Sequence, residues 1–214
     1  GGFEHNYQSL RVVDELEQRY AEFSGLNLTF ETREGVLKHC SPHRAEMLGE
    51  VAQRFIRKEQ PSLEAQLANI ADEIAYNTHD VDDGLRAGLI TLEQLADVTY
   101  FRVHYDSVRN RYPALAQRRV IHEAVRRMIN GQVTDLIEST KKNISAVQPQ
   151  DVHQVRAASQ PMINFSRDMQ EQNQQLKHFL RVNLYRHYRV RRMAAKAGRI
   201  LSALFAAFMD DIHV

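Results

Sequence analysis

The stretch Pro61-Ser-Leu-Glu-Ala-Gln-Leu-Ala-Asn-Ile-Ala-Asp-Glu-Ile-Ala-Tyr-Asn-Thr-His-Asp-Val-Asp-Asp83 is the most informative part of the chain. Proline suits the first turn of a helix, because the N–H that it lacks would have no partner there. Four apolar residues follow at i, i+4, i+7 and i+11 and share one helical stripe: Leu63, Leu67, Ile70 and Ile74. The segment therefore predicts an amphipathic helix with this stripe as its apolar side.

The opposite side of the predicted helix is polar. An advance of about 100° per residue groups Asn69, Asp72, Tyr76, Asp80 and Asp83 there. Periodicity alone favours an ordinary solvent-facing surface. The sharper hypothesis is a site, in which Asp72 would be an oxygen ligand for a divalent cation and Tyr76 and Asp80 would contact a sugar or base. Spacing does not choose between the two.

Helical patterning continues along nearly the whole chain and predicts an all-α fold, a compact multi-helix domain over residues 1–214. We expect helices at about residues 4–20, 33–39, 44–58, 61–84, 91–110, 113–147, 168–188 and 189–212. Residues 26–30 are the only candidate for a strand, and the strand pattern there is weak.

Two short patterns predict helix starts. Thr91 with Gln94 has the spacing of a capping box, and Asp151 with Gln154 would cap a short helix. This short helix would lie in the connection at residues 148–167, which holds two prolines and many polar residues.

Composition is that of an ordinary globular protein, with 43% hydrophobic and 26% charged residues. No apolar run approaches the ~20 residues of a membrane span, so we expect no membrane partner. The longest apolar run, Ile200–Met209, predicts a buried helix. Cys40 is the only cysteine, which excludes an internal disulfide and a zinc site built from cysteines. A lone thiol fits a reducing compartment, most simply the cytoplasm.

Basic residues dominate the end of the chain. No acid occurs from Gln172 to Met209, where eight basic residues gather: Lys177, Arg181, Arg186, Arg189, Arg191, Arg192, Lys196 and Arg199. Such a block indicates either a solvated face or a surface for phosphate or nucleic acid.

Several long motifs in register resemble one protein family. The run Ala71-Asp-Glu-Ile-Ala-Tyr-Asn-Thr-His-Asp-Val-Asp-Asp-Gly84 closely resembles bacterial dGTPase-like proteins of the HD superfamily, whose members hydrolyse deoxynucleoside triphosphates. Further matches follow in the family's order: Gly2-Phe-Glu-His-Asn6, Gln8-Ser-Leu-Arg11, Gly25-Leu-Asn-Leu-Thr-Phe-Glu-Thr-Arg-Glu-Gly35, Arg126-Arg-Met-Ile129, Val133-Thr-Asp-Leu-Ile137 and Leu184-Tyr-Arg-His187. The resemblance covers essentially the whole chain.

The resemblance implies a divalent metal, held in this family by a histidine, an adjacent His-Asp pair and a later aspartate. Asp72 matches the later aspartate; Mn²⁺ or Mg²⁺ is expected first, with Fe, Ni, Co and Zn left open. Tyr76 and Asp80 match positions that line the sugar pocket. His5 falls near a histidine that acts as proton donor or phosphate contact, and His122 aligns loosely with a substrate-side position.

The implied reaction is attack of water on the α-phosphate, which releases the deoxynucleoside and intact triphosphate. Arginine and lysine side chains are expected around the highly charged triphosphate. The candidates are the basic residues near the end of the chain together with Arg118, Arg119, Arg126 and Arg127. The chain opens on Gly1-Gly-Phe3 without methionine, and the other metal ligands would lie upstream. We therefore expect a piece of a longer protein that is inactive alone. His79-Asp80 follows Asp72 and does not match the metal-binding pair.

Alternatives remain open. One is an HD phosphohydrolase for a different nucleotide, and another is a helical nucleic-acid-binding or regulatory module, since some relatives are thought to bind single-stranded DNA. Relatives also assemble into tetramers or hexamers and respond to activating dNTPs, so the resemblance implies a homo-oligomer with such an effector. Glycine-rich phosphate loops and Gly-x-Ser-x-Gly are absent, which excludes P-loop and serine-hydrolase motifs.

Overall fold

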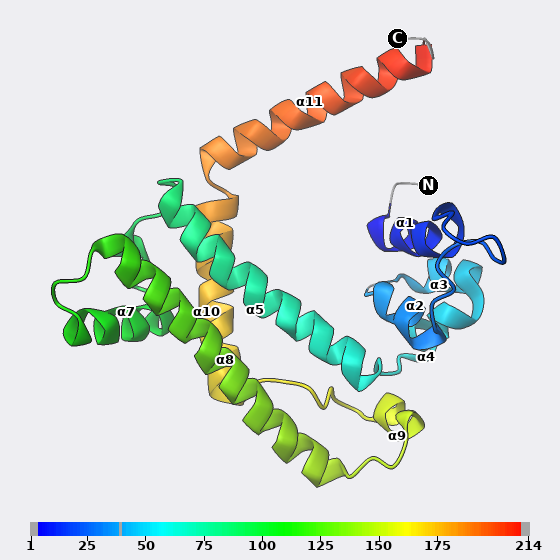
Figure 1. The fold of residues 1–214 in the computed structure, drawn as a ribbon, viewed down its shortest axis with the longest axis horizontal. Coiled ribbons are helices and arrows are strands. Elements are labelled where there is room, and N and C mark those ends of the chain that lie inside the picture. The colour runs from blue at the N-terminus through cyan, green and yellow to red at the C-terminus, as the bar shows by residue number, and fades with distance from the viewer. Residues whose placement is uncertain (1–3, 39, 211–214) are drawn as a thin grey trace. The chain divides into compact units, whose positions relative to one another are not determined.

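The computed structural model describes residues 4–38 and 40–210, and these residues are mostly helical (Figure 1). Within them there is no β-strand; a single isolated bridge joins Gln18 and Gly25. The prediction of an all-α fold is confirmed. Gly1–Phe3, His39 and Asp211–Val214 lie outside the described residues, as do the predicted helix ends at residues 39 and 212.

The chain divides into two compact units. Unit 1 consists of Gly1–Glu73 and Asp135–Phe165, and unit 2 consists of Ile74–Thr134 and Ser166–Val214. The sequence carries no mark of this division, because the helices α5 (Leu63–Arg86) and α8 (Gln117–Val147) each contribute to both units.

Unit 1 is built from short helices around one apolar cluster. Leu10, Leu37 and Val51 are buried in it, and Phe30 and Phe55 pack against them. Besides parts of α5 and α8, the unit contains α1 (His5–Arg11), the π-helix η1 (Val12–Leu16), α2 (Phe30–Val36), α3 (Pro42–Leu48), the 3-10 helix η2 (Gly49–Ala52), α4 (Gln53–Arg57) and α9 (Val152–Ala157).

The first predicted helix, at residues 4–20, is too long. The backbone N–H of Leu26 donates to the carbonyl of Val13 at 2.8 Å. This bond occupies a carbonyl that would accept from the N–H four residues later if the helix continued. Gly25 allows this approach, because a Cβ there would lie 2.3 Å from the carbonyl oxygen of Asp14. The strand expected at residues 26–30 is also wrong, since Thr29 caps α2 instead.

The helix expected at residues 44–58 is present as three consecutive segments, α3, η2 and α4. The break falls at Gly49, whose φ of 68° lies in the left-handed region that glycine adopts without strain. The predicted cap at Asp151 is confirmed, because its carboxylate accepts from the N–H of Gln154 at the start of α9.

Unit 2 contains the long helices α7 (Thr99–Arg111), α10 (Arg167–Leu180) and α11 (Tyr188–Asp210), with the remaining parts of α5 and α8. Its short segments are α6 (Leu92–Leu95) and the π-helix η3 (Arg181–Tyr185). Thr91 and Gln94 form the predicted capping box, although the helix that it opens is only α6. Val108, Val120 and Ala124 form a buried cluster between α7 and α8.

The α5 helix is confirmed, but its buried side differs from the predicted stripe. Leu67 is exposed, whereas Gln66 and Thr78 are buried. Gln66 is tolerated there because its carboxamide oxygen accepts from the N–H groups of Met162 and Ile163 at 2.9 and 3.1 Å. Buried polar side chains are stable when they are hydrogen-bonded in this way.

None of the described helices combines the length and apolar content that a membrane span needs.

Candidate functional site

A tyrosine–aspartate pair forms the centre of the candidate site in unit 2. The hydroxyl of Tyr185, at the end of η3, donates a hydrogen bond to the carboxylate of Asp80 on α5. The ring of Tyr185 lies nearly parallel to that of Tyr76, with an angle of 12° and 6.3 Å between centroids. The structure thus brings the two predicted sugar-pocket residues together with a third residue from a distant part of the chain.

Burial raises the pKa of the Tyr185 phenol well above its ordinary value, and the neighbouring Asp80 and Tyr76 raise it further. The phenol therefore stays protonated and remains a hydrogen-bond donor. Its donation to Asp80 leaves carboxylate lone pairs available for a second donor.

A cavity of about 650 Å³ opens beside the two tyrosines. Its lining residues are Tyr76, Gln174, Lys177, His178, Arg181, Tyr185 and Arg186. Six of the seven lie on α10, on η3 or directly after it, spaced so that they share one side of a continuous helical rod. The other side of that rod is held in place by buried apolar residues, including Leu176, Leu180 and Leu184.

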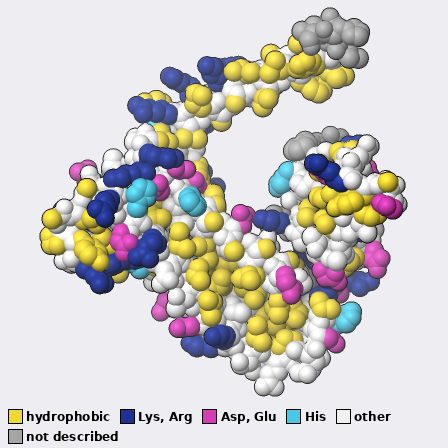
Figure 2. All heavy atoms as spheres, viewed as in Figure 1, with side chains coloured by type: hydrophobic (Ala, Val, Ile, Leu, Met, Phe, Trp, Pro, Cys, Tyr) yellow, Lys and Arg dark blue, Asp and Glu magenta, His cyan; other side chains and the backbone are white. Residues whose placement is uncertain are grey.

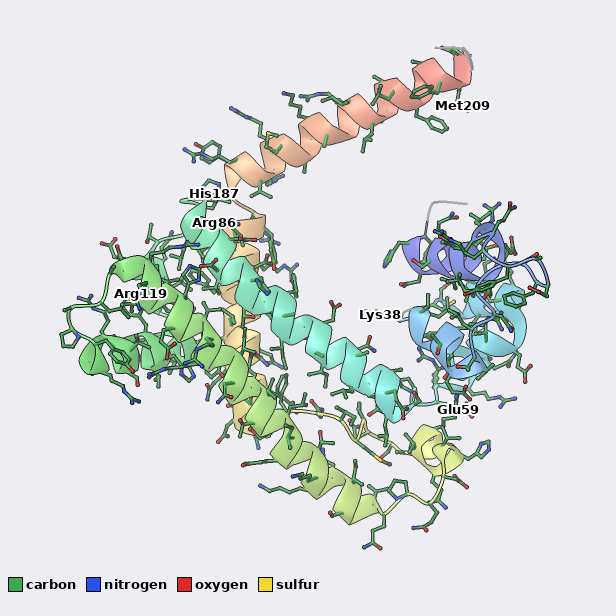
Figure 3. The ribbon with its side chains drawn as sticks, viewed as in Figure 1. Lys38, Glu59, Arg86, Arg119, His187 and Met209 are labelled. Carbon is green, nitrogen blue, oxygen red and sulfur yellow. The ribbon has the colours of Figure 1, made fainter. Side chains whose placement is uncertain are left out.

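The chemistry of this cavity suits an anion with a flat or apolar portion. Lys177, Arg181 and Arg186 bring three positive charges, and Tyr76 and Tyr185 bring aromatic faces. The sequence singled out these three cations only as members of a larger basic class. His187, labelled in Figure 3, marks where the chain leaves η3.

Sequence reasoning missed Tyr185, Gln174 and His178 as candidate site residues. A signal was present, because Lys177, Arg181 and Tyr185 recur every fourth residue and Tyr185 lies in the Leu184–His187 motif. What was lacking was the long-range pairing with Asp80.

Asp72, the predicted metal ligand, lies in unit 1 and is 68% exposed. Its carboxylate pairs with the ammonium group of Lys38 at 2.9 Å; Lys38 is labelled in Figure 3. Among residues 4–38 and 40–210, no three His, Cys, Asp or Glu side chains gather in a way that could hold a metal. The described residues alone therefore do not fit a divalent metal site at Asp72.

The two predicted histidines lie elsewhere. His5 belongs to unit 1, and its side chain is 77% exposed, 3.6 Å from the Glu4 carboxylate that caps α1. His122 belongs to unit 2, where it lies 3.8 Å from the Asp82 carboxylate. It lines a separate cavity of about 490 Å³ with Tyr112, Leu115, Arg119, Glu123 and Arg126. Their proposed roles stay predictions.

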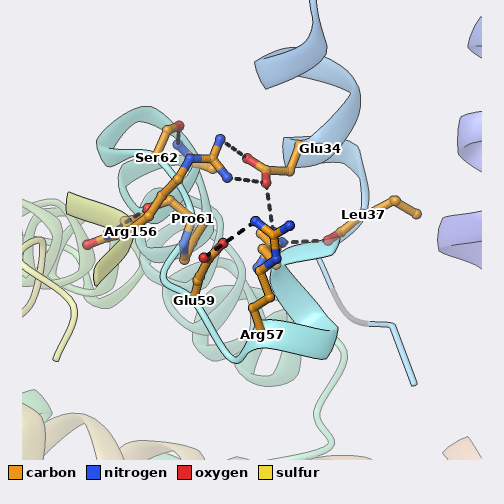
Figure 4. A network of polar contacts seen from close by, with 10 residues as sticks. Glu34, Leu37, Arg57, Glu59, Pro61, Ser62 and Arg156 are labelled. Carbon is orange, nitrogen blue, oxygen red and sulfur yellow. Dashed lines mark hydrogen bonds and ion pairs between the residues drawn. The ribbon is translucent and has the colours of Figure 1, made fainter. Parts of the chain in front are cut away.

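A buried charge network in unit 1 was not predicted (Figure 4). Arg156 donates two hydrogen bonds to the Glu34 carboxylate, at 2.6 and 2.8 Å. Arg54 lies 3.7 Å from the same carboxylate and donates to the carbonyl of Leu37 at 2.7 Å. Glu34 is almost completely buried, so this network joins α2, α4 and α9 rather than exposing a reactive group.

The all-α fold is consistent with that of the helical phosphohydrolases. Residues 163–213, which include α10, η3 and α11, match the phosphohydrolase-associated domain. Over its whole length the chain is a relative of the deoxyguanosinetriphosphate triphosphohydrolase-like proteins, so the family resemblance of the sequence is confirmed.

Three such relatives show the extent of the similarity. The protein from Thiobacillus denitrificans is 61% identical over 214 residues, which are 100% of this chain and 57% of the relative. Those from Bordetella pertussis and Ralstonia pickettii are 59% and 57% identical over 211 residues, 99% of this chain and 55% and 54% of each relative. The chain thus spans just over half the length of the curated relatives that it matches.

Proposed function

We propose that the protein to which this chain belongs hydrolyses deoxynucleoside triphosphates, and that the cavity beside Tyr76 and Tyr185 holds the nucleotide. The observation that supports this most strongly is the Tyr185–Asp80 pair with three cations beside it. The names of the relatives support the same class of reaction.

Each part of the cavity suits one part of such a nucleotide. Asp80 would accept a hydrogen bond from a sugar hydroxyl while Tyr185 fixes the carboxylate. The ring of Tyr76 would pack against the sugar or base. Lys177, Arg181 and Arg186 would neutralise phosphate oxygens, whose negative charge otherwise repels an incoming nucleophile.

The proposed reaction balances with water as the only co-reactant. The water oxygen bonds to the α-phosphorus, and the bond between this phosphorus and the sugar O5′ breaks. O5′ takes up a proton, so the products are the deoxynucleoside and inorganic triphosphate. The cations of the cavity would keep the triphosphate product in place until the sugar departs.

We also propose that Asp72 is one ligand of a divalent metal, Mn²⁺ or Mg²⁺, whose other ligands lie outside this chain. Metal binding would require the carboxylate to exchange its ion pair with Lys38. His5 and His122 are proposed as phosphate-side and substrate-side residues. An activating dNTP and a homo-oligomeric assembly remain predictions of the family resemblance.

The experiment is triphosphate release by the full-length protein from each dNTP with Mn²⁺ or Mg²⁺. Asp80→Asn and Arg181→Gln are expected to raise KM, and Asp72→Ala is expected to abolish turnover and metal binding together. Arg109→Gln on α7 is the matched control, because it removes an exposed cation away from the cavity. No triphosphate from any dNTP, with metal-loaded and folded protein, would exclude this function and favour another nucleotide.

A further inference from the structure

The second cavity of unit 2, of about 490 Å³, lies against the first turns of α8. Among the residues that the structure describes, it shares no lining side chain with the cavity beside Tyr185. Small-molecule sites in proteins have volumes of about 300–1,000 Å³. This cavity is therefore large enough for a ligand of its own.

Four of its lining residues share one face of α8, within about 100° around the helix axis: Arg119, His122, Glu123 and Arg126. The other two precede the helix. Leu115 packs against the buried cluster between α7 and α8, and Tyr112 adds an aromatic ring. The cavity thus has a charged side and an apolar side.

The surroundings of this cavity are strongly basic. Residues 99–130, which form α7 and the first part of α8, contain seven arginines and only two acids, Asp106 and Glu123. Figure 2 shows Lys and Arg side chains gathered over α7 and the beginning of α8, where Arg119 is labelled in Figure 3. A basic surface around a cavity attracts anions.

Arg119 carries a positive charge that no carboxylate compensates. Its neighbours Arg118 and Arg126 form ion pairs, with Asp82 at 3.5 Å and with Glu123 at 2.8 Å. Arg119 forms no ion pair with any of the residues that the structure describes. An anionic ligand in the cavity would supply the missing negative charge.

The other two basic side chains of the cavity are held by carboxylates. Arg126 donates to both oxygens of Glu123, from Nε at 2.9 Å and from Nη2 at 2.8 Å, which leaves Nη1 for a ligand. His122 Nδ1 lies 3.8 Å from Asp82 Oδ1, a buried oxygen that accepts no hydrogen bond within the described structure. With a proton on Nδ1 beside this oxygen, Nε2 is the nitrogen that remains for a ligand.

The helix α5 supports the two cavities of unit 2 from nearly opposite faces. Asp80 and Asp82 are two residues apart, which separates them by about 200° around the helix axis. Asp80 accepts the hydrogen bond from Tyr185, whereas Asp82 lies beside Arg118 and His122. Each carboxylate therefore belongs to a different site.

We propose that the second cavity binds the phosphate group of a small phosphate ester, separately from the nucleotide. Arg119 and Arg126 would donate to the phosphate oxygens, and His122 would contact them through Nε2. Arginine suits this role because its guanidinium group is permanently charged and carries several N–H donors. Tyr112 and Leu115 would cover the apolar part of the ester.

Isothermal titration calorimetry of the full-length protein tests the proposal, with inorganic phosphate and phenyl phosphate as ligands. Arg119→Gln is expected to lower the affinity of this cavity for both ligands about tenfold, because a hydrogen bond to a charged group is lost. Arg109→Gln is the matched control, since it removes an exposed cation of α7 that does not line the cavity. Arg181→Gln should weaken phosphate binding in the nucleotide cavity and leave this site unchanged.

Tyr112→Ala distinguishes a phosphate ester from free phosphate. It should weaken the binding of phenyl phosphate, whose ring packs against the tyrosine, and leave the binding of inorganic phosphate unchanged. Far-UV circular dichroism checks that every variant keeps its helical content. The test is independent of the proposed function, because binding is measured without turnover.

Three results would overturn the proposal. Equal losses in Arg119→Gln and Arg109→Gln would show a general attraction by surface charge. Loss of all phosphate binding in Arg181→Gln would show that the cavity beside Tyr185 is the one phosphate site. Equal affinity for the two ligands, unaffected by Tyr112→Ala, would show that the cavity takes free phosphate.

Discussion

The hydroxyl of Tyr185 and the carboxylate of Asp80 form a hydrogen bond between residues 105 positions apart in the chain. This bond joins the end of η3 to α5 and fixes the orientation of a carboxylate that contacts Tyr185, one of the residues lining the cationic cavity. The proposed sugar contact therefore depends on Tyr185 as a positioning residue as well as on Asp80 itself.

Tyr185→Phe is expected to raise the KM of the full-length protein for dNTPs about tenfold, because it removes a hydrogen bond to a charged group. The ring remains, so kcat should change much less. Tyr188→Phe, which removes an exposed hydroxyl three residues later, is the control. An equal loss in both variants would contradict the positioning role.

Glu34→Gln is expected to lower the free energy of unfolding by about 3 kcal/mol, because it leaves buried guanidinium groups without their counter-charge. Arg156→Gln should cost less, since Arg54 still lies beside Glu34 in that variant. Urea denaturation of the chain measures both. If Arg156→Gln proves the more damaging change, Arg54 does not pair effectively with Glu34.

Stability should fall as the pH drops below about 6.5, the ordinary pKa of histidine. Burial and, to a lesser extent, the nearby Arg127 lower the pKa of His104 in the folded chain. Between that lowered value and about 6.5 the unfolded chain binds more protons, so protonation favours unfolding. His104→Gln should reduce this slope in urea denaturation at pH 7.5 and 5.5, whereas exposed His153→Gln should not.

Gly84→Ala is expected to destabilise unit 2 by about 1 kcal/mol, as overpacking outweighs the gain in helix propensity. An added Cβ would lie 2.8 Å from Cδ1 of Ile90, which is itself buried. Ile90→Val removes that methyl group, so the double variant should lose less than the two single changes combined. Strict additivity in thermal denaturation would show that the two positions do not interact.

The local features of the fold were predictable, because each depends on residues close in sequence. The capping box at Thr91, the cap at Asp151 and the long α5 helix all follow from spacing. The buried side of α5 could not be predicted from spacing. Gln66 is buried because it accepts hydrogen bonds from backbone N–H groups almost a hundred residues later in the chain.

The candidate site shows the same limit. Tyr76 and Asp80 were predicted from one helix and a family motif, and the structure brings them together with Tyr185. Tyr185 itself could not be paired from spacing, since no periodicity connects η3 with α5. The predicted burial of Ile200–Met209 failed for a related reason: an apolar stripe specifies that something covers it, but not what.

The π-helical winding of η3 has a consequence for insertions and deletions. A π-turn holds one residue more than an α-turn, so the rod shared by α10 and η3 contains a single extra residue within Arg181–Tyr185. Deleting one residue within η3 would restore ordinary α-helical winding and leave the residues beyond it facing nearly as before, whereas deleting one residue within α10 would turn them by about 100°. After a deletion in α10, Tyr185 and the start of α11 would face elsewhere with their chemical identity intact. The cavity is therefore encoded by the number of residues in α10 as well as by their type, and η3 is the place in the rod where the loss of one residue disturbs it least.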